Sequence, residues 1–266
     1  LKFEQEQNIA PNPFIYFIQD YEPGFYPWST RYLLADSTYR SDRKQIAVFN
    51  SGLLYEFFRE NKYAFYREYA FEPVLNAGLK KELSEHAGET VNKKRQILVY
   101  GRPSVDRNAF SLVVSSLKKF VERMDSAENW EFVSAGEYHD KVNIGKGKSL
   151  TSVGKVTIEE YARLMMESYA GISLMSSPHP SYPPLEMSEF GVRVITNNYA
   201  NKDLSVFNKN ITSVSNVSPD NIAMQLEKIC KDYTADYRLE VLNQEYVENN
   251  HVFSFIDKIL EDLKLS

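Results

Sequence analysis

Cysteine is nearly absent from this chain of 266 residues, because Cys230 is the only one. A single thiol excludes an internal disulfide and any zinc site built from several cysteines. The four histidines, at positions 86, 139, 179 and 251, show no HxxxH or HxH spacing, which argues against a metal site. No run approaches the roughly eighteen apolar residues of a membrane span, and no secretory signal is visible. We therefore expect no metal and no cofactor.

Several common motifs are missing as well. No GxGxxG follows a strand-like run, and neither a Walker A loop nor a GxSxG elbow occurs. Residues 145–148, Gly-Lys-Gly-Lys, have the composition of a phosphate loop, but no helix start follows them, so we expect a solvated hairpin. The formal net charge of −5 gives no reason to expect nucleic acid as a partner.

What is present is an alternation of strand-like and helix-like segments in an ordinary globular composition, 43% hydrophobic and 25% charged. Short apolar runs alternate with segments whose apolar residues recur every three or four positions. This order predicts an α/β fold with parallel sheets built from right-handed βαβ units. We expect strands over residues 14–18, 44–49, within 63–75, 96–100, 131–135, 150–153, 169–175 and 192–196, and helices over 30–39, 52–61, 110–124, 157–167, 185–190 and 219–231.

The predicted domain boundary is a region without apolar periodicity. Residues 77–95, with Lys, Glu, Gly and Asn, form the expected linker. Residues 1–76 are predicted to be the trailing part of an N-terminal α/β domain whose first strands are absent, in a truncated chain or a divergent minimal form. Residues 96–240 form the second domain. The helices of residues 241–266 are expected to pack back toward the N-terminal part.

The most informative stretch is PHPSYPPLEMSEFGVRVITN, residues 178–197. Pro183 and Pro184 fix φ where a helix should begin, directly after a predicted buried strand. A helix that starts at the carboxyl end of a strand presents backbone N–H groups and the positive end of its dipole to an anion. Glu186, in the first turn, can accept hydrogen bonds from neutral sugar hydroxyls. This turn predicts a site for a sugar nucleotide.

A second turn supplies positive charge. Arg102 and Arg107 follow the predicted strand 96–100, so we expect both guanidinium groups to face the crevice at the carboxyl ends of the strands. Two arginines suit a diphosphate, because each makes bidentate, charge-assisted hydrogen bonds to oxygen. The alternative is that one or both form surface ion pairs with Asp106 or Glu137.

Other candidate residues lie in loops. His179 precedes the predicted helix at 185–190, where its ring can hydrogen-bond a sugar hydroxyl or a phosphate; a structural loop histidine is the alternative. Gln19, Asp20 and Glu22 follow the first strand and would face the cleft if the two domains oppose each other. Asp20 and Glu22 are candidates for a base or for positioning hydroxyls, and loop carboxylates without such a role are the alternative.

These motifs resemble a known family. The run G-R-P-x3-R at 101–107, the turn G-K-V at 154–156 and the run from 183 to 197 together resemble the donor domain of GT-B glycosyltransferases of family 4. The segments FIQDYEPGFYPW and SPHPSYPPLEMSEFG are still more similar to WsaF-type bacterial rhamnosyltransferases, which use dTDP-rhamnose. The resemblance implies a GT-B-like fold of two Rossmann-like domains, of which residues 96–240 bind the donor nucleotide. It also implies metal-independent sugar transfer with retention of configuration.

The resemblance further implies roles for individual residues. Arg102 and Arg107 fall on the family's Arg and Lys that hold the donor diphosphate. Glu186 falls on the second glutamate of the E(x)7E motif, which binds the nucleotide ribose. The backbone at Pro184 and Leu185 falls on the diphosphate-binding turn.

The remaining correspondences concern the base and the donor sugar. The turn at 154–156 falls where the base is usually read, and Gln19-Asp20 falls where many members carry a cleft histidine that touches the donor sugar. Position 178, where the first glutamate of E(x)7E would stand, is proline, and we expect His179 and Ser181 to substitute for it. The predicted catalytic residues are Asp20, Arg102, Arg107 and His179, and the predicted substrate-binding residues are Gln19, Glu22, Gly101, Gly154, Lys155, Ser181, Tyr182, Pro184, Leu185 and Glu186.

The expected function is transfer of a sugar, with rhamnose favoured, from a nucleotide-diphosphate donor to a glycan or lipid-linked glycan acceptor in bacterial surface polysaccharide synthesis. The expected location is the cytoplasm, at the inner face of the membrane through peripheral association. A non-catalytic GT-B-like module that binds glycan or a partner enzyme is the alternative. A GT-B epimerase or phosphorylase ranks lowest, because no lysine lies in an obvious cofactor-anchoring motif.

Overall fold

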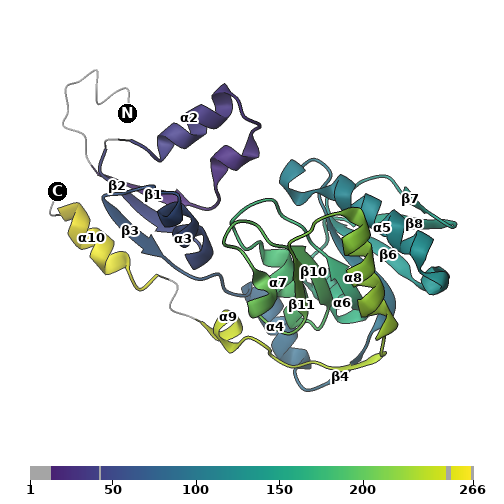
Figure 1. Cartoon of the computed structure of the whole chain (residues 1–266). Helices are drawn as coiled ribbons and strands as arrows, with labels where there is room; N and C mark the ends of the chain where they lie inside the picture. Colours follow the sequence, from purple (N-terminus) through teal and green to yellow (C-terminus); the bar gives the residue numbers. More distant parts are fainter. Residues whose placement is uncertain (1–12, 42, 250–252, 265–266) are drawn as a thin grey trace. The chain divides into compact units, whose positions relative to one another are not determined.

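The chain folds into two units, which Figure 1 shows in a computed structural model that describes residues 13–41, 43–249 and 253–264. Unit 1 comprises the residues up to Val74, Ser177–Pro180 and the residues from Asn249 on, and unit 2 comprises Leu75–Ser176 and Ser181–Glu248. Residues 1–12, 42, 250–252 and 265–266, which the predicted domain boundaries include, lie outside the described residues.

Unit 1 is built on a three-stranded sheet in the order β1-β2-β3, and its strands are parallel, as the sequence predicts. The side-chain oxygen of Ser51 accepts a hydrogen bond from the Leu54 N–H at 3.2 Å, so Ser51 caps the helix after β2, which begins at Gly52. The elements are β1 (Phe14–Ile18), a 3-10 turn (Glu22–Phe25), α2 (Thr30–Thr38), β2 (Gln45–Phe49), α3 (Gly52–Glu60), β3 (Arg67–Ala70) and α10 (Ile256–Lys264).

The central strand of unit 1 is buried on both faces, because helices cover both sides of it. Ala47 and Phe49 join a cluster with the apolar side of α3, whereas Ile46 and Val48 pack against Ile259 of α10. This alternation follows the two-residue period of a strand. Figure 1 shows α10 lying along this sheet within unit 1.

Unit 2 contains a seven-stranded sheet in the order β11-β10-β9-β5-β6-β8-β7, parallel except for β7. Its β5, α5 and α8 share one hydrophobic cluster, while α4 packs against α6. The elements are α4 (Ala77–His86), β4 (Thr90–Asn92), β5 (Lys94–Gly101), a 3-10 turn (Asp106–Asn108), α5 (Phe110–Arg123), a 3-10 turn (Asp125–Asn129), β6 (Glu131–Gly136), β7 (Val142–Gly145), β8 (Lys148–Gly154), α6 (Ile158–Glu167), β9 (Ser168–Ile172), α7 (Tyr182–Glu189), β10 (Arg193–Asn197), a 3-10 turn (Leu204–Val206), β11 (Ile211–Val214), α8 (Pro219–Lys231), β12 (Asp236–Arg238) and α9 (Gln244–Glu248).

The structure corrects the predicted linker at 77–95. This segment forms α4 and β4, and both belong to unit 2. Leu79 and Leu83 of α4 are buried, and β4 pairs with β12. Two leucines four residues apart are sufficient to bury one face of a helix this short. Because the residues around them are mostly charged, the sequence shows no clear apolar periodicity here.

The C-terminal helices divide between the units. Helix α10 packs against the sheet of unit 1, whereas α9 belongs to unit 2. Tyr246 and Val247 of α9 are buried there, and Leu75 N–H donates a hydrogen bond to the Tyr246 carbonyl at 2.9 Å. In the described part of the chain, no helix is both long enough and apolar enough to cross a bilayer.

Candidate functional site

The strand order of unit 2 reverses beside β5. The chain runs from β5 to β6 and β8 on one side, and then returns to place β9, β10 and β11 on the other side. At such a reversal the loops that follow the two central strands diverge, and ligands of open α/β sheets bind there. The loops in question are residues 102–109, after β5, and residues 173–181, after β9. These are the two turns that the sequence singled out.

Hydrogen bonds connect the two loops directly. The Ser176 N–H donates to the Arg107 carbonyl at 2.8 Å, and the Asn108 side-chain amide donates to the Leu174 carbonyl at 3.4 Å. Both bonds join residues of unit 2. The backbone of Arg107 therefore lies next to the segment that leads into α7.

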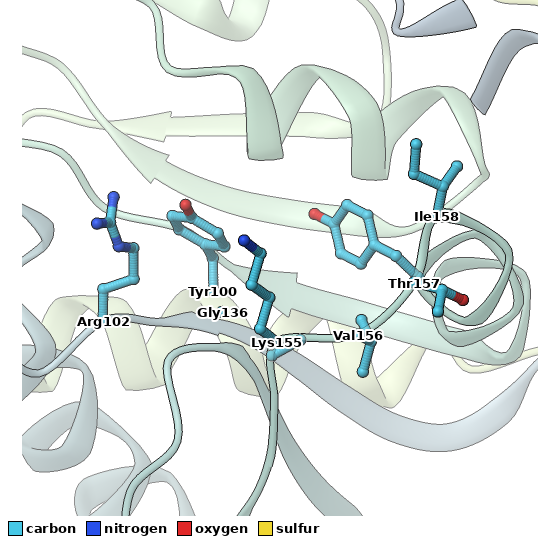
Figure 2. Close-up of a pocket in the computed structure, with 9 residues that line it drawn as sticks. Tyr100, Arg102, Gly136, Lys155, Val156, Thr157 and Ile158 are labelled. Carbon is cyan, nitrogen blue, oxygen red and sulfur yellow. The ribbon is translucent and has the colours of Figure 1, made fainter. Parts of the chain in front are cut away.

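A cavity of about 390 Å³ opens at the carboxyl ends of β5, β6 and β8. Figure 2 shows the nitrogen-bearing ends of Arg102 and Lys155 pointing to the same side of this cavity. The predicted residues Arg102 and Lys155 thus share one cavity, whereas Arg107 is not part of its wall. The lining residues are Tyr100, Arg102, Ala135, Gly136, Lys155, Val156, Thr157, Ile158 and Tyr161.

The two cations of the cavity lack ionic partners within the described residues. Neither Arg102 nor Lys155 forms an ion pair or a side-chain hydrogen bond there. Glu137, the predicted alternative partner of Arg102, instead accepts a hydrogen bond from the Ser104 N–H at 3.0 Å. Hydrogen bonds from Ser104 hold the pKa of Glu137 below its usual value, and the Arg102 charge adds to this effect. The arrangement leaves two positive side chains available to an anion.

Glycines allow the strand ends to approach one another here. Gly101 ends β5, and a Cβ at this position would lie 2.0 Å from the side-chain oxygen of Ser134 on β6. Gly154 ends β8 with φ +68°, a conformation that suits glycine. Both predicted glycines therefore directly precede residues of the cavity wall, Arg102 and Lys155, although neither glycine is part of that wall.

The start of α7 offers fewer amides than the sequence prediction assumed. The helix begins at Tyr182, and its next two residues, Pro183 and Pro184, carry no N–H. Only Tyr182 and Leu185 carry an N–H among the first four positions, and the predicted binding of an anion here stays a prediction.

Ser181, which precedes α7, adopts φ 67°. This left-handed region is uncommon for a residue with a side chain, and such backbone strain is found preferentially at functional sites. The Ser181 side chain does not cap α7. Its predicted role in binding the donor stays a prediction.

Glu186 lies in the first turns of α7 with a partly buried side chain. Desolvation raises the pKa of its carboxyl group to about 7, and the carboxyl forms no hydrogen bond or ion pair with the described residues. Its charge raises the pKa of Tyr161, after the larger effect of burial, so the two side chains lie near each other. A carboxyl without a partner, close to the cavity wall, suits a ligand that carries hydroxyl groups.

The remaining predicted residues belong to unit 1. Asp20 is buried, and its carboxylate accepts hydrogen bonds from the Tyr21 N–H at 2.8 Å and from the Ser177 hydroxyl. His179 is also buried, and the Asn50 amide lies 3.2 Å from its Nε2. Asp20 and Asn50 follow β1 and β2, so the carboxyl edge of this sheet holds both residues.

These contacts change the expected character of the loop residues. Asp20 is not an exposed carboxylate but part of a buried polar cluster with Ser177, whose oxygen also accepts the His179 N–H at 3.1 Å. Gln19 is exposed, and Glu22 is half-buried in the 3-10 turn after β1. Their catalytic or binding roles stay predictions.

Sequence reasoning gave no site role to six residues of the cavity: Tyr100, Ala135, Gly136, Thr157, Ile158 and Tyr161. The first three end β5 and β6, and the rule that located Arg102 applies equally to them. Tyr161 lies one turn after Thr157, which caps α6 in a capping box with Glu160. No pattern in the sequence distinguishes Tyr161 from an ordinary apolar position of α6.

Known proteins match this chain along most of its length. Residues 95–227 match the family model of the WsaF C-terminal domain, and residues 1–52 match that of the WsaF N-terminal domain. The chain is 28% identical over 254 residues to the O-antigen biosynthesis protein RfbC of Myxococcus xanthus. That match covers 93% of this chain but 19% of RfbC, so the chain spans about a fifth of that relative.

Solved structures share the fold. WaaG, a glycosyltransferase involved in lipopolysaccharide biosynthesis, superposes with a TM-score of 0.62 at 11% identity, covering 100% of this chain and 80% of WaaG. A UDP-forming α,α-trehalose-phosphate synthase from Burkholderia vietnamiensis gives a TM-score of 0.60 at 11% identity, covering 98% of this chain and 68% of the synthase. These likenesses confirm the predicted fold class.

Proposed function

Because the chain belongs to the WsaF-type GT-B glycosyltransferases, we propose that unit 2 binds the nucleotide-diphosphate part of a sugar donor in the cavity beside β5. The observation that carries this proposal is the presence of Arg102 and Lys155 on one cavity, both without an ionic partner among the described residues. A diphosphate supplies the negative charge that these side chains lack.

In this proposal the donor diphosphate lies against Arg102 and Lys155. Charge builds up on the leaving diphosphate as the bond to the sugar breaks, and two fixed cations stabilise that charge. Arg107 lies farther along the same loop and would approach the phosphate from the side of Ser176. The acceptor attacks from the face where the diphosphate leaves, with retention of configuration, and no metal takes part.

The donor and pathway are proposed from the relatives and from one loop. The described relative RfbC acts in O-antigen biosynthesis, and we propose that this chain acts in the assembly of a bacterial surface polysaccharide. Pro178 stands where the resemblance places a donor-binding glutamate, and a less polar grip on the donor would suit a 6-deoxysugar such as rhamnose. The dTDP form of the donor, the glycan acceptor, the cytoplasmic location and the peripheral association with a membrane belong to the same proposal.

Calorimetric titration with dTDP, UDP and GDP tests the binding proposal. We expect Arg102→Ala to weaken binding of the preferred nucleotide by about 1.5–3 kcal/mol, roughly 10- to 150-fold in Kd, because charged hydrogen bonds to the diphosphate are lost. Arg95→Ala is the matched control. Arg95 lies near the amino end of β5 and contacts the Tyr233 ring, so its loss should leave the Kd unchanged.

Two results would contradict the proposal. An unchanged affinity in Arg102→Ala would remove Arg102 from the diphosphate site. No binding of any of the three nucleotides by the unmodified chain would favour the alternative, a GT-B-like module that binds glycan or a partner enzyme without catalysis.

A further inference from the structure

The hydroxyl group of Tyr161 lies where no described residue forms a hydrogen bond with it. Its side chain lines the cavity from α6, and its hydroxyl is buried without a hydrogen-bond partner among the described residues. Buried hydroxyl groups are nearly always hydrogen-bonded, because loss of water without a replacement partner is unfavourable. An unsatisfied phenol on a ligand cavity therefore calls for a partner from outside the chain.

The carboxyl group of Glu186 also lacks a hydrogen-bond partner among the described residues. The group is partly buried, and it is close enough to Tyr161 to influence the phenol electrostatically. The phenol can donate a hydrogen bond, whereas the ionised carboxylate accepts hydrogen bonds and donates none. A ligand hydroxyl can accept from the first group and donate to the second.

We propose that Tyr161 donates a hydrogen bond to a hydroxyl group on the pentose ring of the donor nucleotide. The same hydroxyl group donates a hydrogen bond to the Glu186 carboxylate. This inference rests on the proposed function, and it adds a nucleoside-binding residue for which the family resemblance gave no role. Tyr161 acts here as a binding residue, not as an acid or base.

The positive and negative side chains of the site favour different parts of the proposed ligand. Arg102 and Lys155 attract phosphate, whereas the Glu186 carboxylate repels it once ionised. A neutral hydroxyl is therefore the group that fits next to Glu186. The nucleoside end of the ligand then lies toward α6 and α7, and the diphosphate end lies toward the loop after β5.

Tyr246 provides a matched control. Its hydroxyl is also buried without a partner among the described residues, and its pKa is also raised by burial and by Glu186. Tyr246 belongs to α9, however, and it is not among the residues that line the cavity. Each of the two tyrosines therefore has a buried hydroxyl without a partner among the described residues, but only Tyr161 lines the cavity.

The experiment compares Tyr161→Phe with Tyr246→Phe, measuring the melting temperature without ligand and the Kd for the tightest of dTDP, UDP and GDP. Removing an unsatisfied hydroxyl should leave the melting temperature of either variant unchanged or raised. We expect Tyr161→Phe to bind the nucleotide about 2- to 12-fold more weakly, as for the loss of one hydrogen bond between neutral groups. Tyr246→Phe should bind as the unmodified chain does.

The outcomes separate this inference from the proposed function. Unchanged nucleotide affinity in Tyr161→Phe, with binding by the unmodified chain intact, would overturn the role of Tyr161 alone. Equal losses of affinity in both variants would also overturn it, because Tyr246 does not line the cavity. No nucleotide binding by the unmodified chain would overturn the inference together with the proposed function.

Discussion

Glu186 shows how the surroundings of one residue change its chemistry. A glutamate in water titrates near pH 4.5, whereas burial on α7 raises the pKa of Glu186 to about 7. Near neutral pH this carboxyl exchanges between a form that only accepts hydrogen bonds and a form that also donates one. The loss of solvent around it, rather than any charged neighbour, produces this behaviour.

The raised pKa of Glu186 makes the stability of the fold depend on pH. Between about pH 4.5 and pH 7 the folded state binds more protons at this residue than the unfolded state, so its contribution to stability is full below that range and is lost as the pH rises. We expect Glu186→Gln to reduce the fall in the free energy of unfolding between pH 5 and pH 8, measured by urea denaturation. Glu189, whose pKa burial also raises, should maintain part of the slope.

An identical slope in the variant would show that other groups produce the pH dependence. It would also contradict the buried environment that we assign to Glu186. The comparison needs no ligand and is independent of the proposed function.

At the scale of elements, Lys93 connects two helices that flank the site. Its side chain is buried, and its Nζ donates to the Met165 carbonyl at 2.9 Å and to the Phe190 carbonyl at 2.7 Å. These carbonyls lie at the ends of α6 and α7, where helices leave carbonyl groups unsatisfied and where positive charge is favourable. One lysine thus secures the helix that carries Tyr161 and the helix that carries Glu186.

We expect Lys93→Met to lower the free energy of unfolding by about 2–4 kcal/mol, because two buried carbonyls lose their donor. Urea denaturation followed by circular dichroism measures the change. The neighbouring Lys94 is the control. It forms an ion pair with Glu167 at 2.8 Å with its side chain 54% exposed, so Lys94→Met should cost less than about 1 kcal/mol. Equal effects of the two substitutions would contradict a connecting role for Lys93.

At the scale of the molecule, unit 1 depends on residues from the far end of the chain. Helix α10 closes one face of its sheet through Ile259, which packs against Ile46 and Val48. Asp262 of the same helix pairs with Arg67 at 3.1 Å and accepts a hydrogen bond from the Tyr69 hydroxyl at 2.6 Å. The core of unit 1 is therefore complete only when the two ends of the described chain meet.

We expect Ile259→Ala to destabilise unit 1 by about 2–4 kcal/mol, the usual cost of removing a buried isoleucine side chain beyond Cβ. Hydrogen exchange should accelerate in β2 while the amides of β5 in unit 2 keep their protection. Ile256, on the same helix but 47% exposed, provides the control, and Ile256→Ala should leave exchange in β2 unchanged. Acceleration in β5 as well would show that the two units unfold together.

The sequence by itself determined the order of most elements and the family. Apolar periodicity and capping residues are local, so the helix after Ser51, the capping box at Thr157 and the turn into α7 were readable without coordinates. Arg102 was found by the same means, because residues that follow parallel strands gather at one edge of the sheet, whereas the family resemblance supplied Lys155. The missing amides of Pro183 and Pro184 could also have been read from the sequence.

Only the tertiary structure decided which of these residues share a cavity and which are occupied by other contacts. It buried Asp20 and His179 in hydrogen bonds of unit 1, excluded Arg107 from the cavity wall and added Tyr161 to it. It also converted the expected linker into α4 and β4 of unit 2. The physical reason is that burial and hydrogen bonding depend on neighbours distant in sequence, and those neighbours determine whether a polar side chain is satisfied by the protein or left for a ligand.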